Sequence, residues 1–415
     1  MKQALKRDYF WNTVGVLLQN ATSPILLLIV TRINGIYESG IFSFAFAVSI
    51  ILWSLGMWGG RTYQVSDTRG EFSHRSYAVV RILLSVVMII IAVGFSLINV
   101  YSSHMMLLII VLTLFKVVES YADVLYGVLQ SHNKLYLTGI SLTVKSLVGV
   151  VLFIVVDLLT HNVLYASSAV VIVNLVVLLF YDLRYTQKYE KNILTNITER
   201  TYVNEALVIM KKCAGVFVVF FLALFSLNIP RYFIEKYSPD EIGYFGIIAM
   251  PITLIVLLMT FILQPNVLRL SQIYIAGKYK EFSAVVNRIL LLSFAVGAIV
   301  LIVSALYGPE ILTIIFGVNF EQYRLPLIVI VVGGLASALV AVYLNIFVIM
   351  RRINLPLITL IVTNLLLIIV SLITIQSKGL LAGVTLYAVT NTIQCAVLMF
   401  GYTLIIKRAL RAEKN

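Results

Sequence analysis

The sequence has 415 residues, of which 61% are hydrophobic and only 12% are charged, and its mean hydropathy is +1.01. A soluble domain carries about twice that charged fraction, so the composition excludes a water-soluble enzyme or binding domain as the main body of the chain. The formal net charge of +13 is compatible with nucleic-acid binding, but the positions of the basic residues indicate membrane topology instead.

Twelve apolar runs are each long enough to cross a bilayer as an α-helix. None of the connections between them is long enough to form a soluble domain. The sequence therefore predicts an all-α polytopic membrane protein with twelve transmembrane helices. The runs lie at residues 10–31, 38–59, 78–100, 105–126, 135–156, 163–183, 212–234, 242–264, 284–306, 324–350, 356–375 and 380–406.

Most of the 31 lysines and arginines lie at the N-terminus, in every second connection between runs, and at the C-terminus. The remaining connections carry only a few, among them Arg32, Arg231 and Lys378. Because basic residues accumulate on the cytoplasmic side of membrane proteins, this bias predicts that both termini are cytoplasmic. The excess positive charge is then a topology signal, and no nucleic-acid partner is expected.

The two halves of the chain share local sequence. Residues 38–42 read ESGIF at the start of the second apolar run, and residues 241–245 read EIGYF at the start of the eighth. Such matches indicate an internal repeat, with a first six-helix bundle at 1–190, a cytoplasmic linker at 191–212 and a second bundle at 213–415. Six is an even number, so the repeats are parallel and enclose a central cavity that can open alternately to either side. This arrangement favours a transporter over a static scaffold.

Four charged residues lie inside apolar runs. Lys116, Glu119 and Asp123 share one face of the fourth run, and Lys145 lies in the fifth. At a rise of 1.5 Å per residue, both lysines are expected near the middle of the membrane, where charges are costly and usually face a partner or a water-filled cavity. One interpretation is a polar cavity wall that binds an anion and exchanges a proton or cation. The other is a self-neutralising ladder that pins two helices together.

Three arginines lie at the ends of apolar runs and are further candidates for substrate binding. Arg61 follows two glycines at the inner end of the second run and is the best anion ligand, because a planar guanidinium matches phosphate geometry. Arg32 and Arg231 lie at outer ends. Arg32 suits an interfacial position facing lipid headgroups, and Arg231 is equally compatible with a pair to Glu235 one turn later.

Neither a nucleophile elbow, nor a phosphate-binding loop, nor a metal-ligand spacing occurs in the sequence. The two cysteines are far apart and the four histidines lie singly in short connections, which predicts neither a disulfide nor a metal site. We therefore expect a protein that is not an enzyme and has no cofactor, with H⁺ or Na⁺ as the coupling ion of a transporter.

The most specific stretch of sequence is Trp58–Ser73, WGGRTYQVSDTRGEFS. It resembles the Gly-x-Arg-x-x-Gln-Val-Ser-Asp loop of Wzx-type polysaccharide repeat-unit flippases in the multidrug/oligosaccharidyl-lipid/polysaccharide exporter superfamily. The twelve-span layout agrees with this resemblance over the whole chain. No equivalent motif occurs in the second half.

The resemblance implies a flippase that moves undecaprenyl-pyrophosphate-linked oligosaccharide repeat units across the bacterial cytoplasmic membrane by alternating access, for O-antigen or capsule synthesis. Its partners would be the lipid-linked glycan, membrane lipid and other polysaccharide-assembly proteins. Arg61 matches the motif and would contact the headgroup, with Lys116 and Lys145 extending the positive path inward. The remaining motif residues would contact substrate or shape the loop: Gln64, Ser66 and Asp67.

Two other functions are compatible with the sequence. A cation-coupled multidrug exporter of the same architecture would use acidic cavity residues, for which only Glu119 and Asp123 qualify, and the lysines beside them disfavour cationic drugs. A scaffold for envelope assembly would use the same charges for structure alone. Glu119 and Asp123 are thus candidates either for ion coupling or for balancing the lysines.

Overall fold

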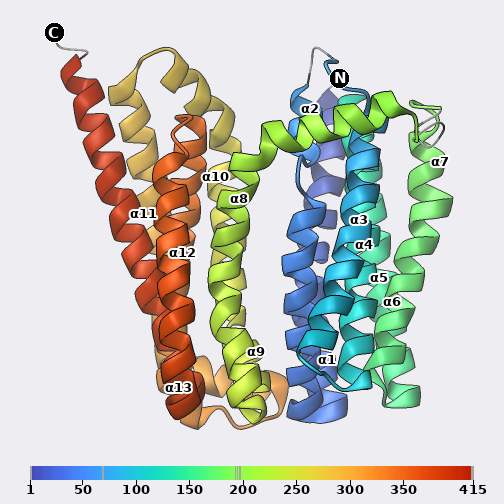
Figure 1. The fold of residues 1–415 in the computed structure, drawn as a ribbon, viewed down its shortest axis with the longest axis vertical. Helices are drawn as coiled ribbons and strands as arrows, with labels where there is room; N and C mark the ends of the chain where they lie inside the picture. The colour runs from blue at the N-terminus through green and yellow to red at the C-terminus, as the bar shows by residue number, and fades with distance from the viewer. Residues whose placement is uncertain (1, 68–69, 192, 194, 196–197, 413–415) are drawn as a thin grey trace. The chain divides into compact units, whose positions relative to one another are not determined.

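The computed structural model describes residues 2–67, 70–191, 193, 195 and 198–412. These residues form α-helices and a few short 3₁₀ and π segments, with no β-strand among them (Figure 1). The first half contains α1 (Lys2–Gly56), α2 (Arg61–Ser66), α3 (His74–Ile98), α4 (Ser103–Ser131), α5 (Leu135–Thr160), α6 (Val163–Val177), the π-helix η1 (Leu178–Asp182) and α7 (Leu183–Thr186). The second contains α8 (Arg200–Tyr237), η2 (Pro239–Glu241), α9 (Ile242–Ile248), α10 (Met250–Ile275), α11 (Tyr279–Phe316), η3 (Glu321–Tyr323), α12 (Arg324–Ile349) and α13 (Asn354–Ala412).

Ten helical segments of the described chain are long and apolar enough to cross a membrane, and two of these, with 60 and 58 residues, suffice for two crossings each. A backbone break divides both: Gly35 has φ 87° and ψ 177° in α1, and Gly379 has φ 54° and ψ −138° in α13. Glycine adopts positive φ without steric cost, so each long helix reverses its direction there. Counting both halves of α1 and α13 gives the twelve predicted spans and confirms an all-α polytopic membrane protein.

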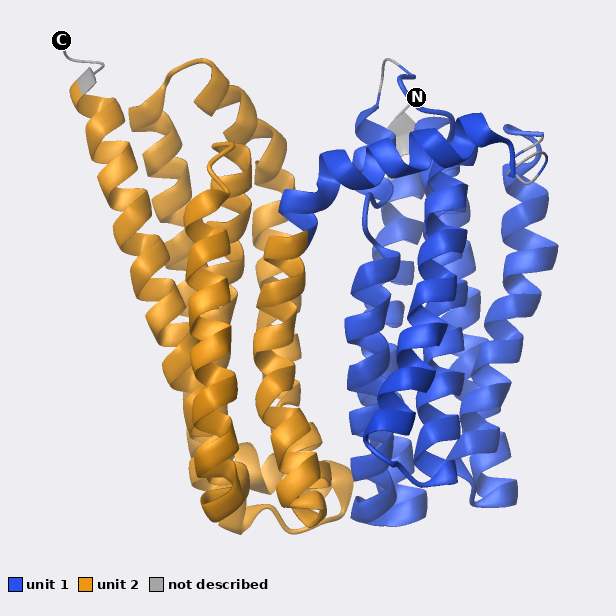
Figure 2. Ribbon diagram, in the orientation of Figure 1, with its two compact units in different colours: residues 1–217 blue, residues 218–415 orange. Residues whose placement is uncertain are grey.

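The chain divides into two compact units, Met1–Phe217 and Val218–Asn415 (Figure 2). Each unit contains six of the twelve spans. The division falls inside α8, whose first part belongs to the first unit. Residues 200–212, which belong to the connection expected as a linker, form the beginning of this helix. Residues 192, 194, 196 and 197 of that connection lie outside the described residues.

In the first unit, α4 is the central helix and packs against α1, α3 and α6, while α5 packs against α1 and α6. The crossing of α1 and α5 is very close. A β-carbon on Gly139 of α5 would lie 2.2 Å from the carbonyl carbon of Trp11, and one on Gly15 would lie 2.5 Å from the Gly139 oxygen. Small residues allow such backbone contact between membrane helices, so this crossing depends on both glycines.

The first part of α8 lies crosswise over the end of the first unit that carries α2 (Figure 2). Its residues Ala206 and Ile209 are fully buried in the core of that unit. Trp58 stacks on Phe217 with ring centroids 4.1 Å apart and donates its indole N–H to the Met210 carbonyl oxygen at 2.8 Å. The loop after the second span therefore holds this arm of α8 in place.

In the second unit, α12 packs against α10, α11 and α13. Many large apolar side chains on the outer helices of the second unit are exposed, including Leu291, Ile299 and Ile373. In water such a surface would be unfavourable, whereas in a bilayer it faces lipid tails while the helical backbone satisfies its own hydrogen bonds.

Candidate functional site

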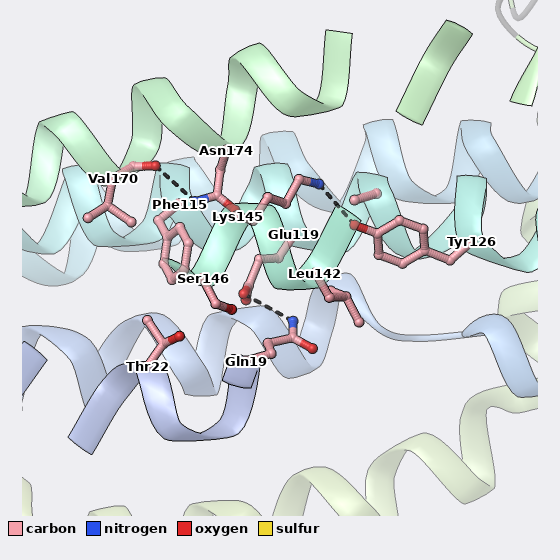
Figure 3. Close-up of a pocket in the computed structure, with 11 residues that line it drawn as sticks. Gln19, Thr22, Phe115, Glu119, Tyr126, Leu142, Lys145, Ser146, Val170 and Asn174 are labelled. Carbon is pink, nitrogen blue, oxygen red and sulfur yellow. Dashed lines mark hydrogen bonds between the residues drawn. The ribbon is translucent and has the colours of Figure 1, made fainter. Parts of the chain in front are cut away.

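A pocket lies inside the first unit, between the first half of α1 and helices α4, α5 and α6 (Figure 3). It contains about 390 Å³ of space not filled by atoms, part of it open to solvent. Both an acidic and a basic side chain line it, along with amides and hydroxyls, so polar groups from four spans converge within an otherwise apolar bundle. The lining residues are Gln19, Thr22, Phe115, Glu119, Ala122, Tyr126, Leu142, Lys145, Ser146, Val170 and Asn174.

Lys145 forms an ion pair with Asp182, which the sequence analysis did not select. The Nζ to Oδ2 distance is 2.5 Å, and the side chains are only 6% and 0% exposed. The ammonium also donates to the hydroxyl of Tyr126 at 3.0 Å, which in turn lies 2.9 Å from the Ser141 hydroxyl. Asp182 ends the π-helix η1, a distortion that often occurs at functional sites. The pair balances the two charges, and Oδ1 of Asp182 is buried without a hydrogen-bond partner among the described residues.

Glu119 also lines the pocket, where it links α4 to α1. Its Oε2 atom accepts a hydrogen bond from the Lys116 ammonium at 2.6 Å, and its Oε1 atom accepts one from the Gln19 amide at 3.2 Å. The lysine and the glutamate side chains are 12% and 10% exposed. Two of the four mid-membrane charges thus form a local pair on one helix, and the Gln19 contact links Glu119 to a second helix.

Asp123 belongs to a different cluster at the inner end of the second span. Its carboxylate lies 3.5 Å from both Arg61 Nε and Arg81 Nη2. The Arg81 side chain is 1% exposed, and it also donates to the carbonyl oxygens of Gly56 and Trp58. Two guanidinium groups share one carboxylate, so this cluster has a net charge of +1.

Arg61 is the partly exposed member of this cluster. Its side chain is 30% exposed, and its backbone N–H lies 3.3 Å from Asp123 Oδ2. Only its Nε atom faces the carboxylate; across the described residues, its two terminal nitrogens make no hydrogen bond or ion pair. A guanidinium with both terminal nitrogens available can bind a phosphate through two parallel hydrogen bonds.

Gln64 of the motif is buried and has a structural contact. Its side-chain nitrogen donates to the Val124 carbonyl oxygen at 3.2 Å and lies 3.1 Å from His74 Nδ1. The side chain fills the space beside Gly127, where a β-carbon would lie 2.1 Å from Gln64 Oε1. Gln64 thus packs α2, which begins at Arg61, against α4.

The other two motif residues shape the loop. Asp67 accepts hydrogen bonds at 2.9 Å from the backbone amides of Glu71 and Phe72. Ser66 is exposed, and its hydroxyl donates to the Tyr63 carbonyl oxygen at 2.9 Å. These contacts stabilise the loop, and a contact of Gln64, Ser66 or Asp67 with substrate stays a prediction.

The two outer arginines differ in their surroundings. Arg32 is exposed near the end of the first half of α1, three residues before the Gly35 break. Arg231 lies over the ring of Phe245 at 5.2 Å from its centroid, and its buried Nε has no hydrogen-bond partner among the described residues. The pair with Glu235 that was one of its two expected environments stays a prediction.

Four site residues were not found from the sequence. Asp182 and Arg81 lie near span boundaries, where charges are common, so they gave no signal of burial. Tyr126 and Asn174 are ordinary residues of apolar helices, and only the folded bundle shows that they face Lys145 and the pocket. Among the described residues, no group of three or more His, Cys, Asp or Glu side chains could hold a metal ion.

Solved structures with similar folds are membrane transporters. The chain superposes on an inward-facing multidrug resistance MATE family transporter of the MOP superfamily with a TM-score of 0.73, at 13% identity over 96% of each chain. It superposes on the lipid II flippase MurJ with a TM-score of 0.64, at 12% identity over 97% of this chain and 88% of that one. The chain has the fold of the MOP superfamily transporters.

Sequence comparison adds a more specific relative. The capsular polysaccharide biosynthesis protein CapF of Staphylococcus aureus is 24% identical over 330 residues, which cover 79% of this chain and 81% of that protein. No protein-family model matches the chain. A MOP superfamily transporter from Pyrococcus furiosus, described as having a binding pocket of reverse polarity, superposes with a TM-score of 0.60 at 14% identity.

Proposed function

We propose that this protein is a flippase that translocates undecaprenyl-pyrophosphate-linked oligosaccharide repeat units across the cytoplasmic membrane by alternating access, for surface polysaccharide synthesis. Its fold is shared with a flippase for another lipid-linked precursor and with multidrug transporters. The similarity to a capsular polysaccharide biosynthesis protein favours the glycan substrate over a drug. On this proposal the protein carries its substrate without altering a covalent bond.

The observation that carries this proposal is the environment of Arg61. Its cluster with Arg81 and Asp123 has one unbalanced positive charge, and Arg61 is its exposed member. A pyrophosphate carries several negative charges and presents oxygens that match the guanidinium fork. The ion pair with Arg81 positions Asp123, and Asp123 in turn orients the Arg61 side chain. The guanidinium of Arg61 is therefore preorganised to bind a headgroup.

Lys116 and Lys145 are the other predicted contacts of the headgroup. Both ammonium groups already have carboxylate partners within 2.6 Å, and both are largely buried. Their pairs are electrically neutral, so they attract an anion less strongly than the Arg61 cluster does. Their contact with substrate stays a prediction, as it does for Arg32 and Arg231.

We further propose that Glu119, rather than Asp123, is the group that couples transport to H⁺ or Na⁺. Glu119 lines the pocket of the first unit, where an ion could reach it. Asp123 lies between two arginines and balances their charge. The test is headgroup flipping in vesicles under an imposed pH or Na⁺ gradient: the Glu119→Gln variant should lose the stimulation by the gradient, while flipping without a gradient continues.

The topology belongs to the same proposal. We place both termini in the cytoplasm of a bacterial cell, because the basic residues collect in the connections on that side. Arg61 and the arm of α8 then lie at the cytoplasmic face, where a lipid-linked precursor would first bind.

The proposal is tested with purified protein in vesicles that contain an undecaprenyl-pyrophosphate-linked oligosaccharide with a fluorescent label. A membrane-impermeant quencher measures how fast the headgroups cross the membrane. Arg61→Ala should abolish flipping. Arg61→Lys keeps the charge without the planar fork and should reduce the rate by about tenfold or more. Arg184→Ala is the matched control, because Arg184 is an exposed arginine on α7, at the same end of the first unit.

Wild-type flipping rates in the Arg61→Ala variant would overturn the assignment of Arg61. Failure of the wild-type protein to move any lipid-linked glycan, together with export of a cationic dye from the same vesicles, would instead favour the multidrug exporter. Normal surface polysaccharide in cells after neutralising Lys116, Glu119, Asp123 and Lys145 together would favour the scaffold.

A further inference from the structure

The ammonium group of Lys116 is surrounded by aromatic rings as well as by Glu119. Its Nζ atom lies 4.6 Å from the ring centroid of Phe115, 5.0 Å from that of Phe46 and 5.7 Å from that of Trp53. Phe46 and Trp53 come from the second half of α1, whereas Phe115 comes from α4. The three rings and the Glu119 carboxylate form a single enclosure, which we call the aromatic box.

The aromatic box has the composition of a site for an organic cation. Aromatic faces within about 6 Å attract a positive charge, and several of them around one point recognise quaternary ammonium groups. A carboxylate at the open side adds Coulomb attraction. Here the occupant is the side chain of Lys116 itself, held at 2.6 Å from Glu119 and only 12% exposed.

Glu119 has a second support that does not depend on the lysine. The Gln19 amide on α1 donates to its other oxygen at 3.2 Å. Its carboxylate also lines the pocket of the first unit, beside Phe115. Removing the lysine head would therefore leave a positioned carboxylate and three ring faces next to an existing cavity.

We propose that Lys116 is a specificity-determining residue: a tethered cation that fills the aromatic box and thereby excludes small organic cations from the first bundle. This role goes beyond the proposed flippase function and does not depend on which substrate the protein carries. It explains why a lysine, an energetically costly residue at this depth, lies on the rings and not toward water.

The test measures saturable binding of radiolabelled tetramethylammonium to the full-length protein in detergent. Lys116→Ala and Lys116→Ser open the aromatic box and should bind the probe at least about tenfold more tightly than the wild type, since cation–π contacts at a desolvated site strengthen each other. Lys116→Arg keeps a cation in place and should bind no better than the wild type. The double variant Lys116→Ala/Glu119→Gln should lose the increase in affinity for tetramethylammonium.

Monodisperse elution and an unchanged helical circular dichroism spectrum establish that a variant is folded. Folded Lys116→Ala or Lys116→Ser protein without saturable binding would overturn the proposal. So would saturable binding of tetramethylammonium to the wild-type protein with Glu119 and the three rings as its site, a measurement that requires no variant to fold. Because the assay contains no glycan, its outcome is separate from that of the flipping experiment.

Discussion

The two units differ in how they fill the interior of a six-span bundle. Among the described residues, all four charged side chains that are buried lie in the first unit: Arg81, Lys145, Asp157 and Asp182. The buried polar residues of the second unit are serines, threonines, asparagines and a glutamine. The first bundle therefore maintains ionic pairs inside, whereas the second, apart from Arg231 with its buried Nε, uses neutral hydrogen bonds.

The neutral network of the second unit centres on Asn364 of α13. Its side-chain oxygen accepts a hydrogen bond from the Ser226 hydroxyl at 2.6 Å, and its nitrogen donates to the Leu222 carbonyl oxygen at 2.8 Å. Gln394, in the second half of α13, donates to the Thr363 hydroxyl at 2.8 Å and to Ser226 at 3.3 Å. Three spans are linked without any ionised group.

These groups occupy matching spans of their units. Lys145 and Asn364 lie on the fifth span of each bundle, and Asp182 and Gln394 lie at or on the sixth. A neutral amide network is thus a sufficient way to join these spans. Buried charges are costly and are retained mainly where they serve a function, so this difference supports the proposal that an ion is coupled in the first bundle.

The largest effect is expected from breaking the buried pair of the first unit. Lys145→Ala leaves the Asp182 carboxylate, which is 0% exposed, without its partner, and should lower the free energy of unfolding by about 3–5 kcal/mol. Titration with a denaturing detergent in mixed micelles, followed by circular dichroism, measures this loss.

The matched control for this prediction replaces both charges. Lys145→Met/Asp182→Leu removes the pair without leaving an uncompensated charge, so its stability should lie close to that of the wild type. If this double variant is stable and yet does not flip glycan, the pair has a functional role. If the double variant is as unstable as Lys145→Ala, the pair itself stabilises the bundle. The first unit could then not replace its ion pair by neutral groups as the second unit does.

A smaller effect is expected at the Arg61 cluster. Arg81→Met removes the buried partner of Asp123 and leaves the carbonyl oxygens of Gly56 and Trp58 without their donor, so unfolding should become easier by about 3 kcal/mol. Arg61→Met removes the partly exposed partner and should cost less than about 1 kcal/mol while flipping is lost. Equal stability losses in the two variants would show that Arg61 is structural as well.

The sequence predicted the membrane fold well, because the length of an apolar run reflects the thickness of the bilayer. The distribution of basic residues among the connections likewise reflects which side of the membrane each one faces. It predicted four mid-membrane charges but not how they pair: Lys145 joins Asp182, and Asp123 joins two arginines. Helix spacing fixes which residues share one face, as it did for Lys116 and Glu119. Partners on other helices depend on rotation and on local changes such as the π-helix at Leu178–Asp182, which periodicity does not reveal.

In the second unit, the corresponding substitution should cost less. Asn364→Leu removes two buried hydrogen bonds, and such bonds between membrane helices contribute on average about 0.6 kcal/mol each and at most about 1.7 kcal/mol. We expect a loss of about 1 kcal/mol in the same titration and unchanged flipping. A loss as large as that of Lys145→Ala would mean that the two bundles depend equally on their interior polar groups.

The smallest effects are expected at the exposed ion pairs, where the two units resemble each other. Glu71 pairs with Lys212 in the first unit, and Glu310 pairs with Arg324 in the second, and all four side chains are well exposed. Water and salt screen such pairs, so Glu71→Gln and Glu310→Gln should both leave the melting temperature and the flipping rate unchanged. Unchanged values in both variants would confine the difference between the bundles to their interiors. A clear fall for Glu71→Gln alone would show instead that the loop holding the arm of α8 contributes to it.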